Sequence, residues 1–331
     1  MPNLRRRTLA SLACLAAAWG LCGSLNAHAA GAYPAKPITL MVAYPAGGDS
    51  DVLARLLGDK LTGMLKQPVV VENRTGAAGM IGTSFVAKAK PDGYTLLVAP
   101  NTVVISPLVI QAAGASGYDV TRDLTPIVQL GRQSLFVVVT GASGVRSAQA
   151  LVAGARSGAI PSYASPGNGS PMHILGELFN KSTGVKIAQV PYRGSVPAVA
   201  DMVGGHVQMM YSTLGPVSQF LPSGKLVPVA VADSRRSSFL PNVPTLAEQG
   251  IKDAEVGAWQ AVLGPKGLPP ELVQRLNAAI NEVLKMPDVI ERLAALAVEP
   301  AGGSPADLAR LIANDHAKYG RLVKEFNIRT D

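Results

Sequence analysis

The sequence predicts an α/β fold in which two lobes, each with its own parallel-rich sheet, enclose a ligand cleft. Short apolar runs alternate along the chain with amphipathic stretches, as they do in sheets that helices cover on both faces. The chain has 331 residues, 48% of them apolar and 16% charged, which suffices for two globular domains. No glycine period or heptad repeat points to a fibrous protein.

Residues 1–29 are expected to be an export signal that is removed from the mature protein. Three arginines at positions 5–7 precede a broken apolar stretch over 8–25, and residues 27–29, Ala-His-Ala, fit a cleavage site. An uncleaved membrane anchor is the alternative. Both cysteines, Cys14 and Cys22, lie in this segment, so the exported chain would contain no cysteine.

Charge and histidine content narrow the range of partners. Without the three arginines of the signal, 27 basic residues stand against 22 acidic ones, a surplus of five. No run of five like charges and no basic stripe with interleaved aromatics occurs, so nucleic acid is not an expected partner. The remaining histidines, His173, His206 and His316, lack metal-ligand spacing, and neither a metal nor a cofactor is expected.

The order of elements follows from the apolar runs. Residues 38–44 read as a strand that ends at Pro45, and a helical pattern follows over 52–65. Further strands are predicted at 69–71, 94–98, 127–130, 136–140, 160–164, 187–190, 207–211 and 227–231. Two helices, 271–284 and 306–319, close the chain, the second after a capping box at Ser304 and Asp307.

A single sheet that contained all of these strands would be large for one hydrophobic core, so we predict two lobes. Residues 30–131 and 259–331 are predicted to form the first lobe, and residues 132–258 the second. The chain then crosses twice between the lobes. A cleft between hinged lobes is the default place for a ligand.

Two glycine-rich loops are the main candidates for binding. Residues 44–51, Tyr-Pro-Ala-Gly-Gly-Asp-Ser-Asp, follow the first strand, and residues 165–171, Ser-Pro-Gly-Asn-Gly-Ser-Pro, follow a strand of the second lobe. Each loop opens a helix, so its backbone N–H groups can bind an anion. If the loops face each other across the cleft, they could hold both ends of a small acid. An ordinary strand-to-helix turn is the alternative for either loop alone.

Catalytic motifs are scarce, and we do not expect an enzyme. The chain contains no Gly-x-Ser-x-Gly elbow, no phosphate-binding loop and no His-Glu-x-x-His motif. Ser170 and His173 stand three residues apart and could act as nucleophile and base, or could simply cap and pack a helix. Asp51 could accept a hydrogen bond from a ligand, or could only favour the start of its helix.

Several segments in consistent order resemble the Bug family, the receptors that serve tripartite tricarboxylate transporters in Gram-negative bacteria. These segments are Tyr33-Pro34-x-Lys36-Pro37-Ile38, Gly47-Gly48-x-x-Asp51, residues 69–76, residues 90–97, residues 165–173, residues 190–194 and residues 236–250. The resemblance implies a two-lobed, type II-like periplasmic binding protein that delivers an organic acid to membrane permease subunits. We expect a monomer. A ligand sensor for a membrane signalling protein is the alternative, and a periplasmic hydrolase is a further one.

The resemblance also implies which residues bind the ligand, largely through main-chain groups and ordered water. On the first loop they are Tyr44, Ala46, Gly47, Gly48 and Asp51. On the second side they are Ser165, Gly167, Asn168, Gly169, Ser170 and His173, with Tyr192, Arg193 and Gly194 nearby. Asn101, Thr102 and Ser212 complete the expected pocket wall. Arg193 could pair with a carboxylate or could simply be solvated.

Three departures from the family pattern bear on specificity. Family members often have proline, histidine and aspartate where this chain has Ala46, Val103 and Ser212. The absence of an acidic group at Ser212 disfavours an amine-bearing ligand such as an amino acid. We therefore expect a di-, tri- or aromatic carboxylate.

Overall fold

The computed structural model describes residues 33–112 and 117–328. The predicted export segment, residues 1–29, and both cysteines lie outside the described residues. The chain from Lys36 onward groups into one compact unit, which contains both of the sheets described below.

The first part of the chain alternates strands and helices in the predicted order. Its elements are β1 (Ile38–Val42), α2 (Asp49–Leu65), β2 (Val69–Asn73), η1 (Ala77–Gly79), α3 (Met80–Ala87), β3 (Thr95–Pro100), α4 (Thr102–Ala112), α5 (Val120–Asp123) and β4 (Leu124–Gln133). The helix predicted over 52–65 begins earlier, at Asp49, because Gly48 serves as its N-cap. The binding loop is therefore short, and its last residues already belong to α2.

The second part forms a separate sheet with its own helices. Its elements are β5 (Phe136–Thr140), η2 (Gly141–Ser143), α6 (Ala148–Arg156), β6 (Ser162–Ser165), α7 (Pro171–Thr183), β7 (Ala188–Pro191), α8 (Ser195–Val203), β8 (Met209–Ser212), η3 (Gly215–Phe220) and β9 (Leu226–Val231). The chain then returns through β10 (Ala258–Pro265), α9 (Pro270–Leu284), α10 (Pro287–Ala295), β11 (Glu299–Gly302) and α11 (Pro305–Glu325).

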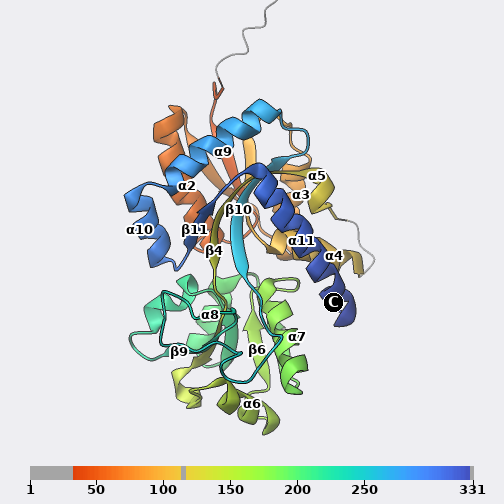
Figure 1. The fold of residues 1–331 in the computed structure, drawn as a ribbon, viewed down its shortest axis with the longest axis vertical. Coiled ribbons are helices and arrows are strands. Elements are labelled where there is room, and N and C mark those ends of the chain that lie inside the picture. Colours follow the sequence, from red (N-terminus) through yellow and green to blue (C-terminus); the bar gives the residue numbers. More distant parts are fainter. Residues whose placement is uncertain (1–32, 113–116, 329–331) are drawn as a thin grey trace, which may run out of the picture. The chain divides into compact units, whose positions relative to one another are not determined.

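Two sheets define two lobes (Figure 1). The six-stranded sheet has the order β11-β4-β10-β3-β1-β2, and the five-stranded sheet has the order β7-β6-β8-β5-β9. Helix α9 packs on α2 and β4, and α11 packs on α4 and β4, so the C-terminal helices cover the six-stranded sheet. Helices α6, α7 and α8 belong to the other lobe. The mixed α/β class with two lobes is confirmed.

The expectation of mostly parallel sheets is corrected. Among the described strands, β1 pairs in parallel with β2 and β3, and β6 does so with β7 and β8. The other pairings, β10 with β3 and β4, β11 with β4, and β5 with β8 and β9, are antiparallel. Strand β4 carries the chain out of the six-stranded sheet and β10 brings it back, so these neighbours run in opposite directions.

Three C-terminal elements were not predicted from the sequence. Strand β10 lies where the second crossing between the lobes was expected. Gln260 and the Gly264-Pro265 pair interrupt its apolar run, so the sequence pattern did not mark it as a strand. Helix α10 and the four-residue edge strand β11 were also missed. The predicted capping box of α11 is confirmed, since Ser304 Oγ accepts from the Asp307 N–H at 3.2 Å and Asp307 Oδ2 accepts from the Ser304 N–H at 3.0 Å.

The core of the second lobe includes helices that pack on the first sheet. Ile105 and Val109 of α4, together with Tyr319 and Val323 of α11, are buried in one cluster with the apolar residues of β5, β6, β8 and α7. This shared cluster joins the lobes beside the cleft. The boundaries 30–131 with 259–331 and 132–258 stay a prediction, and the last residues of β4, Arg132 and Gln133, still pair with β10 in the first sheet.

Candidate functional site

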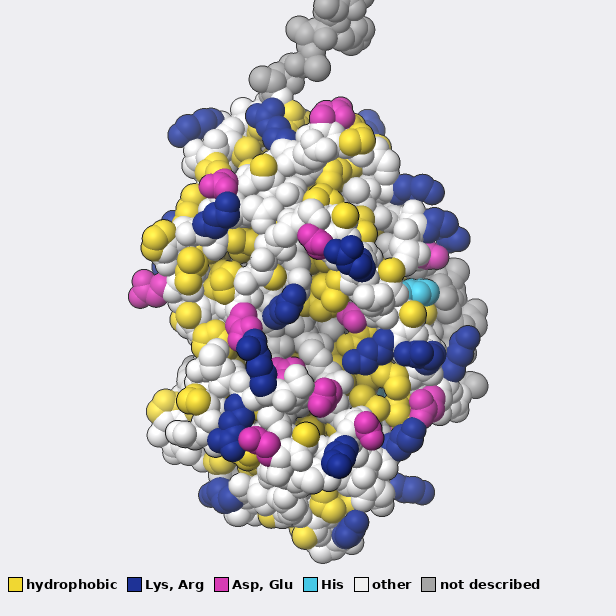
Figure 2. Space-filling view, viewed as in Figure 1, with side chains coloured by type: hydrophobic (Ala, Val, Ile, Leu, Met, Phe, Trp, Pro, Cys, Tyr) yellow, Lys and Arg dark blue, Asp and Glu magenta, His cyan; other side chains and the backbone are white. Residues whose placement is uncertain are grey.

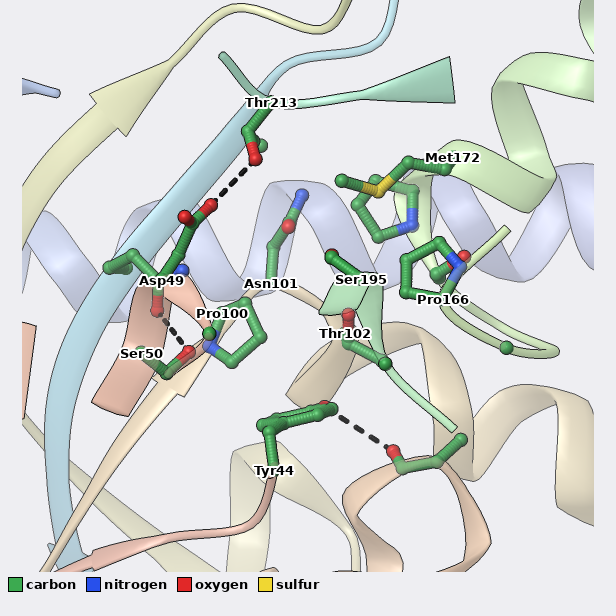
Figure 3. A pocket seen from close by; sticks show the side chains of 18 of the residues that line it. Tyr44, Asp49, Ser50, Pro100, Asn101, Thr102, Pro166, Met172, Ser195 and Thr213 are labelled. Atoms are coloured by element: carbon green, nitrogen blue, oxygen red, sulfur yellow. Dashed lines mark hydrogen bonds between the residues drawn. The ribbon is translucent and has the colours of Figure 1, made fainter. Parts of the chain in front are cut away.

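A cavity of about 80 Å³ lies where loops from both sheets meet (Figure 3). Its walls come from the segments after β1, β3, β6, β7 and β8, with β4 and β10 at its base. A wider cavity of about 1370 Å³ adjoins it and shares Tyr44, Asn168 and Gly194 among its lining residues. The small chamber therefore adjoins the wider cavity and shares part of its wall.

Four helix N-termini surround this cavity. The lining residues include Gly48, Asp49 and Ser50 of α2, Asn101 and Thr102 of α4, Ser170, Pro171 and Met172 of α7, and Gly194, Ser195 and Val196 of α8. The first amides of a helix have no acceptor within the helix, and the helix dipole makes this end positive. No side chain caps α2 or α8, whose N-caps are glycines. The cavity is thus built to receive an anion.

Side-chain cations do not contribute to this site. Among the described residues, the lining of the small cavity contains no Lys, Arg or His, and Asp49 is its one charged side chain. Figure 2 shows lysine and arginine side chains spread over one face of the molecule, interspersed with acidic ones. An anion in the cavity would be held by backbone N–H groups, hydroxyls and helix dipoles.

The first loop is fixed by Asp51. Its carboxylate accepts hydrogen bonds from the Gly47 N–H at 2.9 Å, from Asn73 Nδ2 at 2.9 Å and from Arg55 Nε at 3.0 Å. Burial alone would raise the pKa of Asp51, but the hydrogen bonds from Arg55, Gly47 and Asn73 hold that pKa below its usual value. Asp51 therefore shapes the loop, and neither it nor Gly47 lines the cavity.

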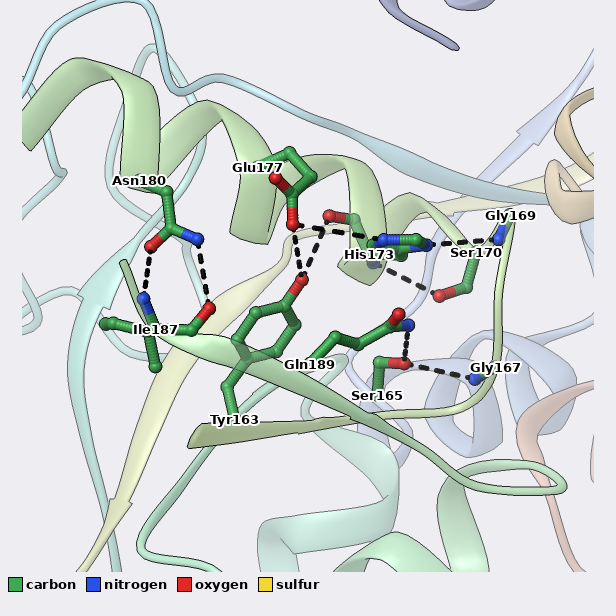
Figure 4. Close-up of polar contacts among 10 residues, drawn as sticks. All are labelled: Tyr163, Ser165, Gly167, Gly169, Ser170, His173, Glu177, Asn180, Ile187 and Gln189. Atoms are coloured by element: carbon green, nitrogen blue, oxygen red, sulfur yellow. Dashed lines mark hydrogen bonds and ion pairs between the residues drawn. The ribbon is translucent and has the colours of Figure 1, made fainter. Parts of the chain in front are cut away.

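The second loop is fixed in a similar way (Figure 4). Ser165 Oγ accepts from the Gly167 N–H at 3.2 Å, and His173 Nδ1 accepts from the Gly169 N–H at 3.4 Å. Ser170 Oγ accepts from the His173 N–H at 3.2 Å, so Ser170 is the N-cap of α7. These bonds support the capping interpretation over that of a nucleophile and base. Burial lowers the pKa of His173 to about 4, so its imidazole is neutral near pH 7.

The structure gathers about half of the predicted site residues around the small cavity. Tyr44, Gly48, Asn101, Thr102, Gly167, Asn168, Ser170 and Gly194 line it. Tyr192 and Arg193 line only the wider cavity, where the Tyr192 hydroxyl donates to Asp201 Oδ2 at 2.7 Å and Arg193 is exposed. The remaining candidates, Ala46, Gly47, Asp51, Ser165, Gly169, His173 and Ser212, line neither of these two cavities. Several of them hold the loops in shape instead.

Sequence reasoning missed a polar group at the base of the cavity. Asp49 Oδ2 accepts from Thr213 Oγ1 at 2.6 Å and from Gln133 Nε2 at 3.0 Å, and Ser50 Oγ donates to Gln260 Oε1 at 2.8 Å. Loss of solvation raises the pKa of Asp49, although both hydrogen bonds act against that rise. The acidic group that is missing at Ser212 thus has a counterpart in the cavity lining, because Asp49 supplies a carboxyl group from the opposite lobe.

The lobes touch directly beside this group. The bond from Thr213 to Asp49 joins the end of β8 to the start of α2. Gly194, with φ of 111°, approaches so closely that a Cβ on it would lie 3.2 Å from Pro45 Cδ. A Cβ on Gly215 would lie 2.8 Å from Asp49 Oδ1. In this conformation, segments of the two lobes are in direct contact beside the cavity.

Two features are absent from the described residues. No helix there combines the length and the apolar character that a membrane crossing requires. No group of three or more His, Cys, Asp or Glu side chains in the same residues has the arrangement of a metal site.

Comparison with known proteins places this geometry in a family. Residues 53–328 match the family model described as the tripartite tricarboxylate transporter family receptor. The chain belongs to this receptor family. Protein BugT of Bordetella pertussis is 37% identical over 321 residues, which cover 96% of this chain and 97% of BugT.

Solved structures of similar proteins share the two-lobed fold of this receptor. The R. palustris protein Rpa4515, solved with adipate, has 33% identity and a TM-score of 0.84 over 90% of this chain and 99% of its own. MatC from Rhodopseudomonas palustris, with bound malate, has 28% identity and a TM-score of 0.81 over 88% of this chain and 100% of its own. The predicted Bug resemblance and the periplasmic binding protein fold are confirmed.

Proposed function

We propose that this receptor captures a small organic carboxylate between its two lobes and delivers it to the membrane subunits of a tripartite tricarboxylate-type transporter. The observation that carries this proposal is the convergence of four helix N-termini on one small cavity without a cationic side chain. Such an arrangement suits a carboxylate, whose two oxygens can accept from several N–H groups at once.

The energy available from these donors is sufficient. A hydrogen bond to a charged group contributes roughly 1.5 to 3 kcal/mol. Micromolar affinity requires about 8 kcal/mol. Four or five such bonds therefore suffice, after the cost of ordering the ligand, without the arginine clamp that other carboxylate sites use.

The similar proteins support the ligand class. Adipate and malate are both aliphatic dicarboxylates, and each was found on a protein with the same fold and with about 30% identity to this chain. We infer that the residues lining the small cavity, with Ser195 and Val196 added to those predicted, hold one carboxylate of the ligand.

The remaining parts of the proposal concern location and assembly. We propose that residues 1–29 direct export to the periplasm and that the mature protein is a monomer. The proposed lobes are residues 30–131 with 259–331 and residues 132–258. Size-exclusion chromatography and mass spectrometry of the protein purified from the periplasm check the cleavage site and the monomer.

A panel of ligands tests the binding function. We expect one or more of a few dozen di-, tri- and hydroxycarboxylates to raise the melting temperature, because a ligand at a hundred times its Kd stabilises the folded state by about 2.7 kcal/mol. If none of the acids raises the melting temperature or binds in calorimetry, the proposed function is wrong. Loss of uptake of the bound acid after gene deletion would separate transport from sensing.

Replacement of Gly48 by valine tests whether the ligand binds in this cavity. A Cβ on Gly48 would contact only the Pro45 carbonyl oxygen, at 3.5 Å, and φ is −81°, so the variant should fold. Its added methyl groups should fill part of the cavity and abolish ligand binding. Gly63→Val is the matched control, because Gly63 lies on the same helix and a Cβ there would meet nothing within 4 Å. If Gly48→Val still binds the ligand, this loop does not have the proposed role.

A further inference from the structure

Two amide side chains in the lining of the cavity each have an oxygen without a hydrogen-bond donor. Gln133 directs its Nε2 to Asp49, and its Oε1 is buried with no partner among the described residues. Asn101 directs its Nδ2 to the Gly257 carbonyl at 3.0 Å, and its Oδ1 is likewise buried and unpartnered. Both residues line the cavity and are at most 5% exposed. Since each NH2 group has a carbonyl or carboxylate partner, the amide orientations are defined.

Asp49 adds a carboxyl group to the same lining. As the first residue of α2, Asp49 places a carboxylate at the positive end of that helix, and so it opposes the attraction of α2 for a ligand anion. Helices α7 and α8 have no acidic residue in their first turns. A ligand carboxylate is therefore best placed against α7 and α8, away from Asp49, because like charges repel at short range.

The ligand group that faces Asp49 must satisfy these acceptors. A buried acceptor without a donor costs about 1 to 3 kcal/mol, and more when it is charged. Thr213 and Gln133 already donate to Asp49 Oδ2, but the oxygens of Gln133 and Asn101 remain without donors. A methylene group at this place would leave these two oxygens without a donor and would offer none to Asp49, whereas a hydroxyl or an ammonium group could donate to them.

We propose that the cavity selects a short carboxylic acid that also carries a hydrogen-bond donor, a hydroxyl or an ammonium group, and that Asp49 is the residue that sets this selectivity. The inference rests on the proposed carboxylate-binding function and narrows its ligand class. It reverses the expectation of a ligand without an amine, because the missing acidic group at Ser212 is replaced by Asp49 from the other lobe.

The size of the cavity agrees with a short ligand. A cavity of about 150 Å³ takes a benzene molecule, and the chamber here has about 80 Å³. In this conformation it therefore holds a fragment smaller than an aromatic ring, and any longer part of the ligand extends into the adjoining wider cavity. An aromatic acid with its ring in the small chamber does not fit.

Two matched ligand series test the selectivity on the wild-type protein by isothermal titration calorimetry. Propionate, lactate and alanine differ only in the group on one carbon, and so do succinate, malate and aspartate. We expect the hydroxyl or ammonium member of at least one series to bind ten times or more tighter than its unsubstituted member. The titrations are run at pH 8, because burial raises the pKa of Asp49 and a higher pH favours its carboxylate form.

The variant Asp49→Asn then separates charge from hydrogen bonding. It keeps the shape and one acceptor oxygen, so we expect a preference for ammonium to fall tenfold or more and a preference for hydroxyl to fall less. Asp59→Asn is the control, since Asp59 is an exposed residue of the same helix and loses the same charge. Thermal melting without ligand verifies that both variants are folded.

Three outcomes would contradict either the selectivity inference or the proposed function, and they can be told apart. If wild type binds acids but does not discriminate within either series, the selectivity inference is wrong and the proposed function stands. If Asp49→Asn weakens every ligand by the same factor, Asp49 only joins the lobes through Thr213, and the inference is again wrong. If no acid of either series or of the wider panel binds, the proposed function itself fails.

Discussion

Replacement of Thr213 by valine should weaken ligand binding by about tenfold to a hundredfold. Thr213 is 2% exposed and donates its hydroxyl to Asp49 at 2.6 Å, a distance typical of a charge-assisted bond. Valine has nearly the same shape, so the substitution removes the hydroxyl without leaving a void. The bond joins the two lobes, and its loss therefore acts mainly on the closed conformation that holds the ligand.

The magnitude follows from the chemistry of the bond. A hydrogen bond to a charged group contributes roughly 1.5 to 3 kcal/mol, and each 1.4 kcal/mol changes a dissociation constant tenfold. Asp49 keeps its bond from Gln133, so its carboxylate is not left without donors. The Thr213 bond lowers the pKa of Asp49, so the variant should also raise that pKa further.

The assay is calorimetric titration of the tightest-binding acid into wild type, Thr213→Val and Thr213→Ser. Serine keeps the hydroxyl and should retain affinity within a few-fold. Urea unfolding of the unliganded proteins measures any general loss of stability, which we expect to be smaller than the loss of binding energy. An affinity of Thr213→Val within a factor of two of wild type would refute the idea that this bond contributes to closure.

Two further predictions concern the second lobe. His173 has a pKa of about 4 in the folded protein and about 6.5 when unfolded, so its contribution to stability is complete above pH 6.5 and declines as the pH falls toward 4. Between pH 7.5 and 5.0 wild type should lose about 2 kcal/mol of unfolding free energy more than His173→Asn, measured with urea; parallel pH profiles would contradict this. Gly194→Ala should cost roughly 1 to 3 kcal/mol of stability and impair binding, because φ is 111° and the Cβ would press on Pro45. Gly158→Ala, at φ of 77° with nothing within 4 Å, is its control, and equal effects of the two would rule out the lobe contact.

Local sequence patterns predicted the alternation of elements well but not the direction of the strands. Apolar runs and capping residues act within a few positions, and they located β1 to β9 to within a few residues. Strand β10 depends on its partners β3 and β4 on either side, and its own sequence has Gln260 and Gly264 among apolar residues. Pairing with β3 and β4 therefore determines strand β10, which no local sequence pattern predicted.

The helix phase decides which loop residues reach the ligand, and this explains the gap between predicted and observed site residues. Asp49 and Asp51 are two positions apart, which on an α-helix corresponds to about 200° of rotation. Asp51 therefore turns back to Gly47 and Asn73, whose hydrogen bonds lower its pKa, while Asp49 faces the cavity, where desolvation raises its pKa. Because Gly48 is the N-cap, Asp49 and Ser50 are the first two helical residues. Asp49 accepts from Thr213 of the opposite lobe, and Ser50 donates to Gln260 of β10 in its own lobe. The family motif Gly47-Gly48-x-x-Asp51 thus contains the residue that shapes the loop, Asp51. Asp49, at an unspecified position of the same motif, supplies the carboxylate that faces the cavity.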